Sequence, residues 1–483
     1  MISTRNGAAL AGSGETGVRA DRVVVTRREV LKKGLICAAG IAYLPAVLAA
    51  CNSMPAPTPT PTDFLARKLG GSLKLGSFSY TDPGRDAAMK EIDSAFAAVT
   101  GLSVTPSLID HNTFADPLGQ YIPYQPDDLF TWIFGYRMRA FAAKGLISPI
   151  DDVWALVSDN FPPGFAQVVS NDGHVYGIPT DFYPWCVLYR KSLWAAKGYT
   201  VPTTWDEFLT LCGKMKTDGL TPIAFSDRDG WPAMGTFDIL NLRLNGYDFH
   251  MGLLSGKEMW ADPRVTAVFE AWRKLIPFYT PGFTTLSWQQ GTDALITKKA
   301  GMTYMGLFVT SEFDTIDPTG AAKADIDFFP FPLFGNDFDA ERAIEAPVDA
   351  WVMCSKSPTL AVDLDNAKAY LEFWARGSTQ LLLHKANSGY IPTASDTDLS
   401  ALDPLSRKAI PLVREAKRIT QFMDRDTRPD FAGAGSMQLF LLRFLENPDQ
   451  DLAALEKSIQ DFWDVLPPYA GLSRVKNLGH FRA

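Results

Sequence analysis

The 483-residue sequence predicts an α/β fold divided between two lobes, each of them a sheet flanked by helices. Runs with strand character alternate with segments of helical apolar spacing, an order typical of parallel strands joined by helices. Apolar residues make up 46% of the chain and charged residues 21%, ordinary values for a protein with a packed core. Domains usually have about 100–200 residues, so a single sheet over this length is not expected and two lobes are.

The predicted elements begin with a strand at Ser72–Phe78 and a helix at Ala87–Val99. Four apolar residues of this helix recur at the spacing of one helical face: Met89, Ile92, Phe96 and Val99. A later helix opens after Thr203 or Thr204, where a hydroxyl precedes an acidic first turn. The other expected strands are Leu102–Leu108, Asp128–Phe134, Val175–Pro179 and Cys186–Tyr189. The helix that opens after Thr203 or Thr204 is expected over 204–216, and the other expected helices are 137–144, 263–275, 360–376, 436–445 and 452–463.

The N-terminal segment has the layout of an export signal. A basic stretch precedes the apolar run Gly34–Leu48, which is too short to span comfortably a bilayer core about 30 Å thick. The adjacent Arg27 and Arg28 indicate the twin-arginine export route. We therefore expect residues 1–50 to be a twin-arginine signal peptide, with a buried helix or a membrane anchor as the alternative.

A lipid attachment point follows the apolar run. The tetrapeptide Leu48–Cys51 resembles a bacterial lipobox, in which the cysteine receives lipid and becomes the new N-terminus. Residues 52–62 are rich in Pro and Thr, a composition that favours an extended chain. We expect Cys51 to be lipidated and residues 51–69 to form a tether that holds the protein at the membrane surface.

Composition argues against several other classes of protein. A net charge of −8 gives no electrostatic footprint for nucleic acid. Three cysteines remain after Cys51, namely Cys186, Cys212 and Cys354, and an odd number without a C-x-x-C spacing favours buried free thiols, with one disulfide as the alternative. The five His residues show no metal-ligand spacing, so we expect neither a metal nor a cofactor. No metalloprotease, serine-hydrolase or nucleotide-binding motif occurs after residue 50.

An ordered set of short motifs carries a family resemblance. Three of them are DGHVYGIP at 172–179, LYRK at 188–191 and PTTWDEF at 202–208. Further matches follow in order, at 214–222, 230–232, 260–263, 299–308 and 389–392. The set resembles the extracellular solute-binding proteins of bacterial ABC importers, in the carbohydrate-binding cluster that includes maltose-binding protein. The chain departs from the family pattern at Arg190, at Phe308 and in the bulky strand 350–355.

The resemblance, which spans about residues 70–470, implies a type II periplasmic-binding-protein-like fold with a ligand cleft between the lobes. Lobe 1 is expected at 70–182 plus 327–394, and lobe 2 at 183–326 plus 395–483. Chain crossings near 180–185 and 327–331 would then act as hinges. The implied function is capture of a carbohydrate, an oligosaccharide or glycoside, outside the membrane and its delivery to the transmembrane subunits of an ABC permease. We expect a monomer without enzymatic activity.

Residues expected to contact a sugar combine two kinds of chemistry. The C–H faces of a sugar stack on aromatic rings, and its hydroxyls hydrogen-bond to carboxylate, amide or guanidinium groups. Loops at predicted strand ends, which match the family's ligand loops by their order, supply both kinds of side chain. Trp231, exposed by its Gly and Pro neighbours, is the strongest single candidate. The full expected set is Phe78, Tyr80, Asp110, Asn112, Trp132, Tyr136, Asp181, Trp185, Asp229, Trp231, Phe308, Asp349, Trp351 and Tyr390.

Other interpretations of these residues stay open. Each aromatic could belong to the packed core instead, and Asp110 and Asn112 could serve turns or helix caps. A secreted hydrolase acting on glycans would use similar side chains, with two carboxyls about 5–10 Å apart. A receptor for another polar solute, such as a phosphodiester, would need a cluster of cations. Only Arg85, Arg137 and Arg228 lie near the expected loops, which makes a sugar the better hypothesis.

Overall fold

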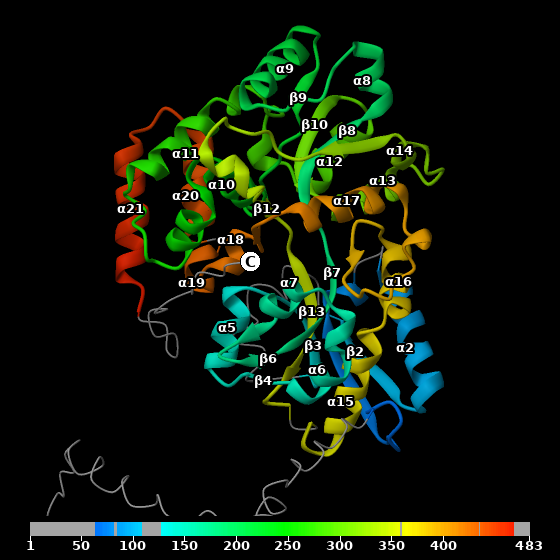
Figure 1. Cartoon of the computed structure of the whole chain (residues 1–483). Coiled ribbons are helices and arrows are strands. Elements are labelled where there is room, and N and C mark those ends of the chain that lie inside the picture. Colours follow the sequence, from blue (N-terminus) through cyan, green and yellow to red (C-terminus); the bar gives the residue numbers. More distant parts are fainter. Residues whose placement is uncertain (1–62, 82–84, 109–126, 358–359, 434, 468–483) are drawn as a thin grey trace, which may run out of the picture. The chain divides into compact units, whose positions relative to one another are not determined.

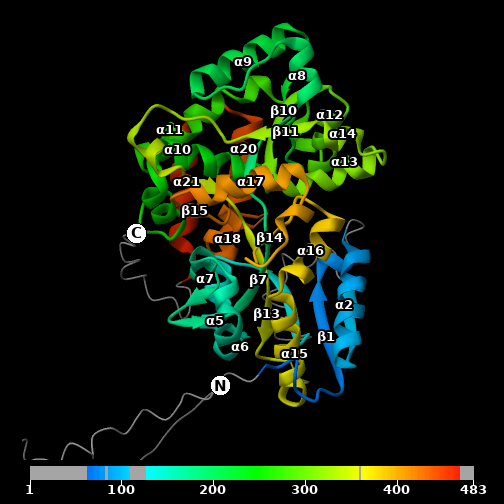
Figure 2. The same ribbon diagram turned by 45° about the vertical axis from the view of Figure 1, so that its right-hand side comes forward.

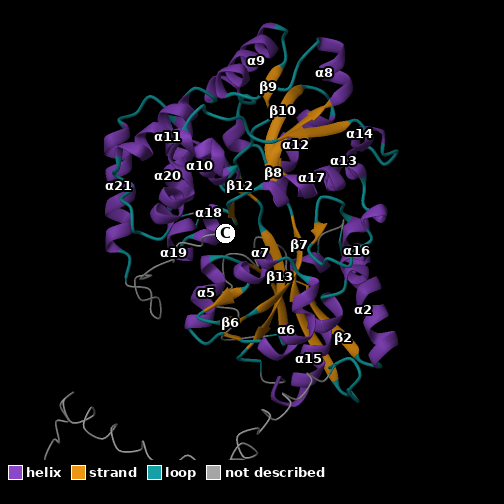
Figure 3. Ribbon diagram, viewed as in Figure 1, coloured by secondary structure: helices purple, strands orange, loops and turns teal. Residues whose placement is uncertain are grey.

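The computed structural model describes residues 63–81, 85–108, 127–357, 360–433 and 435–467 (Figure 1). Two mixed sheets with flanking helices make up this part of the chain (Figure 3). The expected signal residues Arg27 and Arg28, the lipid site Cys51 and the ligand candidates Asp110 and Asn112 lie outside the described residues. Among the described residues, no helix has both the length and the apolar character needed to cross a bilayer.

The larger sheet has the order β14-β7-β13-β3-β1-β2, and β4 also pairs with β13. Its strands are β1 (Ser72–Ser77), β2 (Ser103–Leu108), β3 (Leu129–Ile133), β4 (Ile147–Ser148), β7 (Gly177–Phe182), β13 (Val348–Cys354) and β14 (Ile391–Pro392). The expected strands at the start of the chain are confirmed, and β1 runs parallel to β2 and β3. Strand β13, whose direction the sequence did not indicate, runs antiparallel to β3 and β7, so the sheet is mixed. Val348 lies opposite Phe182, so the chain enters β13 at the end where β7 leaves the sheet.

Helices cover the larger sheet and bury its apolar faces. They are α2 (Asp86–Thr100), α5 (Tyr136–Ala143), α6 (Asp151–Val157), α7 (Pro163–Val168), α15 (Leu360–Trp374) and α16 (Gly377–Ala386), with α16 beside α2 in Figure 2. The helical spacing that predicted α2 is confirmed for Met89, Ile92 and Phe96, which are buried. Val99, in the last turn of α2, is 58% exposed and does not belong to this buried face.

The first described residues dock on helix α15. Phe64 is buried, and its backbone N–H donates to Glu372 Oε2 at 2.8 Å. Arg67 lies over the Phe64 ring at 4.1 Å and pairs with Asp365 at 2.8 Å. These contacts fix the beginning of the described chain to the helical layer of the larger sheet.

The smaller sheet has the order β11-β8-β10-β9. Its strands are β8 (Trp185–Arg190), β9 (Thr221–Ile223), β10 (Ala300–Gly306) and β11 (Ile326–Phe329). The helices around it are α8 (Lys191–Lys197), α9 (Trp205–Thr217), α10 (Pro232–Leu254), α11 (Pro263–Arg273), α12 (Trp288–Ile296), α13 (Thr310–Ile316), α14 (Ala321–Ala324), α17 (Pro404–Glu415), α18 (Met423–Asp426), α19 (Pro429–Ala432), α20 (Met437–Glu446) and α21 (Leu452–Val465). The predicted capping of α9 is confirmed, because Thr204 and Glu207 form a reciprocal capping box.

Helix α10 is an element that sequence periodicity did not predict. Nearly all of its residues are buried, so apolar side chains occur on every side of the helix rather than along one stripe. Gly246 interrupts its geometry with a φ of 78°. A Cβ atom at that position would lie 2.3 Å from the ring of Phe338, so the site needs glycine for space as well as for backbone conformation.

Two further pairs of short strands lie outside the two sheets. β12 (Ile344–Glu345) pairs in parallel with β15 (Ile419–Thr420), and β5 (Ser170–Asn171) forms a hairpin with β6 (His174–Val175). Strand β11 pairs with β8 of the smaller sheet, while β13 lies in the larger one. The chain therefore passes between the sheets after β7 and again between β11 and β13. The residue boundaries expected for the lobes and hinges stay a prediction.

Turns of 3-10 helix lie at Phe78–Tyr80, Ser158–Asn160, Ile276–Phe278, Phe283–Thr285, Leu307–Val309, Asp337–Glu341 and Leu399–Ala401. Three cysteines of the described chain, Cys186, Cys212 and Cys354, are free and buried. Burial raises the pKa of the Cys186 thiol well above its usual range, so this group is a poor nucleophile. The expectation of buried free thiols is confirmed for these residues.

Candidate functional site

An aromatic cluster forms where the smaller sheet meets the larger one. It consists of Tyr183, Trp185, Trp231, Trp288 and Phe308. Their ring centroids are 5.3 Å apart for Tyr183 and Phe308, 5.9 Å for Trp231 and Phe308, and 6.1 Å for Trp185 and Trp231. Tyr183 and Trp185 are buried, and the other three rings are partly exposed. The cluster offers ring surface to a ligand with an apolar face.

The elements that carry these rings explain how they come together. Trp185 begins β8, and Phe308 follows the end of β10. Since β8 and β10 are antiparallel, Trp185 lies opposite Gly306, at the same edge of the sheet. A Cβ atom on Gly306 would lie 2.6 Å from the Phe308 ring, so glycine permits this close approach. Trp231 is the N-cap residue of α10, and Trp288 opens α12.

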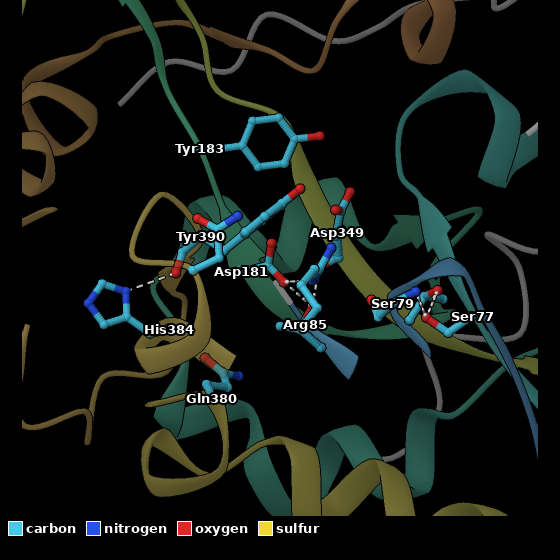
Figure 4. Close-up of polar contacts among 12 residues, drawn as sticks. Ser77, Ser79, Arg85, Asp181, Tyr183, Asp349, Gln380, His384 and Tyr390 are labelled. Atoms are coloured by element: carbon cyan, nitrogen blue, oxygen red, sulfur yellow. Dashed lines mark hydrogen bonds and ion pairs between the residues drawn. The ribbon is translucent and has the colours of Figure 1, made fainter. Parts of the chain in front are cut away.

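Two buried ion pairs lie beside the aromatic cluster. Arg85 Nη2 is 3.7 Å from Asp181 Oδ2, and Arg425 Nη1 donates to Asp349 Oδ1 at 2.9 Å. Asp181 and Asp349 are opposite each other in the register of β7 and β13. All four side chains are less than a tenth exposed. Figure 4 shows the Arg85 side chain against Asp181, with Asp349 nearby.

The ion pairs also contact the aromatic side chains. Arg425 Nη2 donates to the Tyr183 hydroxyl. The Arg85 guanidinium lies 4.0 Å from the centroid of the Tyr390 ring and 5.4 Å from that of Phe78. Tyr390 meets Tyr183 edge to face with ring centroids 5.3 Å apart, and Figure 4 draws both side chains. Charged and aromatic groups thus form one continuous set.

Burial controls the charge state of Asp181. Its side chain is 2% exposed. Burial, followed by the negative charge of Asp349, raises the pKa of Asp181 to about 7, although Arg85 and the Thr180 hydroxyl act in the opposite direction. Asp181 therefore changes its charge close to neutral pH.

Two polar atoms of the site lack a partner within the described chain. They are Asp181 Oδ1, an acceptor when the carboxyl is ionised, and Trp185 Nε1, a donor. Unpaired polar atoms are costly when buried, and most buried polar groups in proteins are hydrogen-bonded. A hydroxyl group both donates and accepts, so it suits either of these atoms as a partner.

Three other residues that the sequence suggested as ligand contacts differ in their surroundings. Asp229 supports the cluster, because its Oδ2 accepts from the Trp288 backbone N–H at 3.2 Å. Tyr80 is buried and donates to Asp93 Oδ2 at 2.9 Å, away from the cluster. Trp351 is fully buried in the core of the larger sheet, and its ring centroid lies 5.5 Å from that of Tyr370.

Two further candidates lie on elements of the larger sheet. Trp132 belongs to β3, where its backbone pairs with Ala350. Tyr136 is the first residue of α5 and is partly exposed. The structure thus brings Asp181, Trp185, Asp229, Trp231, Phe308, Asp349 and Tyr390 into one neighbourhood, with Phe78 joined to it through Arg85.

Sequence reasoning left out Tyr183, Trp288 and Arg425, and it named Arg85 only as a nearby cation. Tyr183 could have been found, because it lies within the aromatic segment that supplied Asp181 and Trp185. Arg425 reaches Asp349 across 76 positions of sequence, and no local pattern marks such a contact. Among the described residues, no group of three or more His, Cys, Asp or Glu side chains is placed to hold a metal ion.

The fold and the site define a class of protein with two α/β lobes and an aromatic, charged site where they meet. The chain belongs to the family of bacterial extracellular solute-binding proteins, and the sequence profile of this family matches residues 81–377.

Solved structures of this class are similar to the chain. The bacterial solute receptor AcbH is 36% identical, with a TM-score of 0.76 over 82% of this chain and 98% of that one, and has an exclusive substrate preference for β-D-galactopyranose. A maltose-bound receptor of T. maritima has a TM-score of 0.66 over 82% and 100% of the two chains at 16% identity, which shows a shared fold.

Curated relatives are more distant. An uncharacterised ABC transporter extracellular-binding protein of Pyrococcus horikoshii is 25% identical over 59% of this chain and 62% of its own length. A probable sugar-binding periplasmic protein of Rhizobium meliloti is 28% identical over 38% and 44% of the two chains. The chain thus spans less than two thirds of the length of these relatives.

Proposed function

We propose that this protein is the sugar receptor of an ABC importer, which captures a carbohydrate outside the membrane and delivers it to the permease subunits. The observation that carries the proposal is the pair of unpartnered polar atoms, Asp181 Oδ1 and Trp185 Nε1, beside a cluster of aromatic rings. Ring faces and paired hydrogen-bonding atoms are the two features that sugar binding requires. Family membership and the sugar-binding relatives support the same conclusion.

The ligand we propose contains a pyranose ring, and β-D-galactopyranose is the first candidate. The 36% identical receptor AcbH has this preference, and it aligns with 82% of the chain. Sequence alone favoured an oligosaccharide or glycoside, and such a ligand would present the same ring to Asp181 and Trp185. Trp231 and Phe308, which are partly exposed, would stack on its C–H face.

Each charged group has a distinct role in this proposal. Asp181 accepts a hydrogen bond from a sugar hydroxyl, and Trp185 Nε1 donates one. Arg85 lies against Asp181, and Arg425 holds Asp349 and Tyr183 in place. The guanidinium groups are already engaged with carboxylates, which favours a neutral sugar over a phosphodiester.

Thermal unfolding against a panel of sugars tests the proposal. A ligand at 100 times its dissociation constant stabilises a protein by about 2.7 kcal/mol, which is measurable as a rise in Tm. We expect galactose or a galactoside to raise Tm, with no product detected by chromatography after incubation. Absence of a shift with every mono-, di- and oligosaccharide would overturn the sugar assignment. Cleavage of a glycoside would favour the hydrolase, and a shift with phosphodiesters alone would favour the other receptor class.

We also propose that the protein is exported by the twin-arginine route and anchored as a monomer by lipid on Cys51. The Arg27–Arg28 pair, the short apolar run and the Pro/Thr-rich segment support this. In a bacterial host, Cys51→Ser should move the protein from the membrane fraction to the soluble fraction, and Lys substitutions at both arginines should block export. Membrane retention of the Cys51→Ser protein would refute lipid anchoring.

A further inference from the structure

One short segment on the smaller-sheet side of the molecule is bound to both sides. Residues 421–426, named the clasp segment below, comprise Gln421, Phe422 and helix α18. The segment is fixed to α10, because the Met423 N–H donates to Asp238 Oδ2 at 2.6 Å. It also contacts α5, which covers the larger sheet, and Figure 1 shows α18 between α10 and α5. The clasp segment therefore bridges the two halves of the molecule.

Two side chains of the clasp segment hold the beginning of β13 in the larger sheet. The Val348 N–H donates to Gln421 Oε1 at 2.9 Å, and Arg425 Nη1 donates to the Val348 carbonyl oxygen at 3.2 Å. Arg425 also donates to Asp349 Oδ1 and to the Tyr183 hydroxyl. Gln421, Val348 and Arg425 are all less than a tenth exposed. Because water does not replace a lost partner at buried positions, each of these hydrogen bonds is costly to break.

A glycine lets the clasp segment approach α5 closely. Gly135 is the N-cap residue of α5, and its φ of 111° lies in a region that favours glycine. A Cβ atom at this position would lie 2.7 Å from the Arg425 carbonyl oxygen and 2.8 Å from Asp426 Oδ1. The first of these atoms belongs to the backbone, which cannot turn aside as a side chain can. Any larger residue at position 135 would therefore push α18 away from α5.

The clasp segment needs no ligand in order to hold. Every contact described above joins two groups of the chain itself, and the bonds to β13 connect positions 73 to 77 residues apart. Separation of the two sides would remove the Asp349 carboxylate from Arg425. Both side chains are less than a tenth exposed, and breaking a buried ion pair is strongly destabilising. The contacts therefore favour the arrangement of the two sheets that this structure shows.

We propose that Gln421 and Gly135 are positioning residues of the candidate site. Through the clasp segment, they hold the smaller sheet against the larger one before any sugar binds, and they keep Arg425 on Asp349 and Tyr183. Neither residue is a proposed sugar contact. A protein that already has its binding arrangement binds with its intrinsic affinity, whereas one that adopts this arrangement for a fraction of the time binds more weakly in proportion.

The first substitution removes a hydrogen bond between the two sides. Gln421→Ala leaves the Val348 N–H without its acceptor. Gln460→Ala is the matched control, because Gln460 Oε1 accepts from the Trp260 N–H at 2.7 Å, and both of these residues lie on the smaller-sheet side. The control thus loses the same kind of bond without a change between the two sheets.

The second substitution adds an obstacle between the two sides. Gly135→Ala introduces the Cβ atom that meets the Arg425 carbonyl oxygen. Gly145→Ala is its matched control, because Gly145 follows α5 and also has a positive φ, of 62°. A Cβ atom at position 145 meets no atom of the described chain within 4 Å. The control therefore has the backbone strain without the obstruction.

Small-angle X-ray scattering of the whole protein without sugar gives the first readout. We expect a larger radius of gyration in Gln421→Ala and Gly135→Ala than in the parent chain, and the parent value in both controls. If Gly135→Ala does not fold, Gln421→Ala and its control decide the question. A parent radius of gyration already equal to that of Gln421→Ala would overturn the proposal. An equal increase in the Gln460→Ala control would overturn it as well, because general loss of stability would then explain the change.

The effect on sugar affinity rests on the proposed function and is measured separately, by calorimetry with galactose. We expect Kd to rise about tenfold in Gln421→Ala and Gly135→Ala, as for a binding arrangement populated about a tenth of the time, and to keep its parent value in both controls. If no sugar binds to any of the proteins while the radius of gyration changes as described, the proposed function fails and the positioning role stands. If galactose binds with the parent Kd to Gln421→Ala and the radius of gyration is unchanged, the positioning role fails alone.

Discussion

Replacement of Asp181 by Asn removes a buried group whose protonation is linked to folding. The side chain keeps its shape and the amide can still contact Thr180, whose hydroxyl lies 2.8 Å from Oδ2. The pKa of Asp181 is about 7 in the folded protein, against 3.8 for an ordinary Asp. A folded-state pKa that is raised means that the native state holds a proton that the unfolded state has lost.

The sign and size of the effect follow from this difference. The proton on Asp181 stabilises the folded protein in full below the pKa that this residue has in the unfolded chain. This contribution to the free energy of unfolding is lost as the pH rises to the pKa in the folded protein. A shift of about three pKa units corresponds to about 4 kcal/mol in the free energy of unfolding. Between pH 4 and pH 7 the free energy of unfolding should therefore fall by about 4 kcal/mol more in the parent protein than in Asp181→Asn.

Urea unfolding at several pH values, followed by tryptophan fluorescence, measures this directly. Asp159→Asn is the matched control, because it makes the same chemical change at an exposed position. Parallel pH profiles for the parent chain and Asp181→Asn would refute the reasoning, since they would mean that Asp181 is ionised throughout this range. Galactose binding gives an independent check. Asp181 accepts a hydrogen bond when it is ionised, so the protein should bind galactose more tightly as the pH rises through about 7.

Three further substitutions separate the site from the core. Trp231→Ala should weaken sugar binding about tenfold or more in calorimetry, because stacked aromatic contacts contribute about 1 kcal/mol or more beyond buried area, whereas an unchanged Kd would remove Trp231 from the site. Arg425→Met should lower the free energy of unfolding by about 3–5 kcal/mol, since Asp349 is left buried and unpaired, and a loss below 1 kcal/mol would contradict this. Trp351→Ala should cost about 3–5 kcal/mol on unfolding while the folded fraction binds sugar with the parent affinity, as expected for a core side chain.

Elements with a local signal could be predicted from the sequence. Helix α9 has a hydroxyl N-cap and an acidic first turn, and α2 has one apolar face that ends at a glycine in the left-handed conformation. Helix α10 has neither periodicity nor a capping side chain, because it is buried on all sides. The antiparallel direction of β13 depends on how the chain returns from the other sheet, which no local pattern records.

The same division applies to the candidate site. Trp185 could be identified because it lies with Asp181 in an aromatic segment between two predicted strands, and Trp231 because it stands between Gly230 and Pro232. Trp351 lies two residues after Asp349, and regular alternation along a strand would place the two side chains on one face. Trp351 is nevertheless in the core, and the register of β13 against β7 shifts between Asp349 and Ala350, an irregularity that no local pattern records. Arg425 depends on a contact made only in the folded chain, so its role emerges from the structure.

The docking of Phe64 on α15 has a mechanical consequence. Its buried ring, the backbone bond to Glu372 and the pair of Arg67 with Asp365 form a firm attachment at the start of the described chain. Tension applied to the chain ahead of Phe64 is delivered to α15 and the larger sheet. A pull from the N-terminal side therefore reaches the larger sheet before it reaches the segments that connect this sheet to the smaller one.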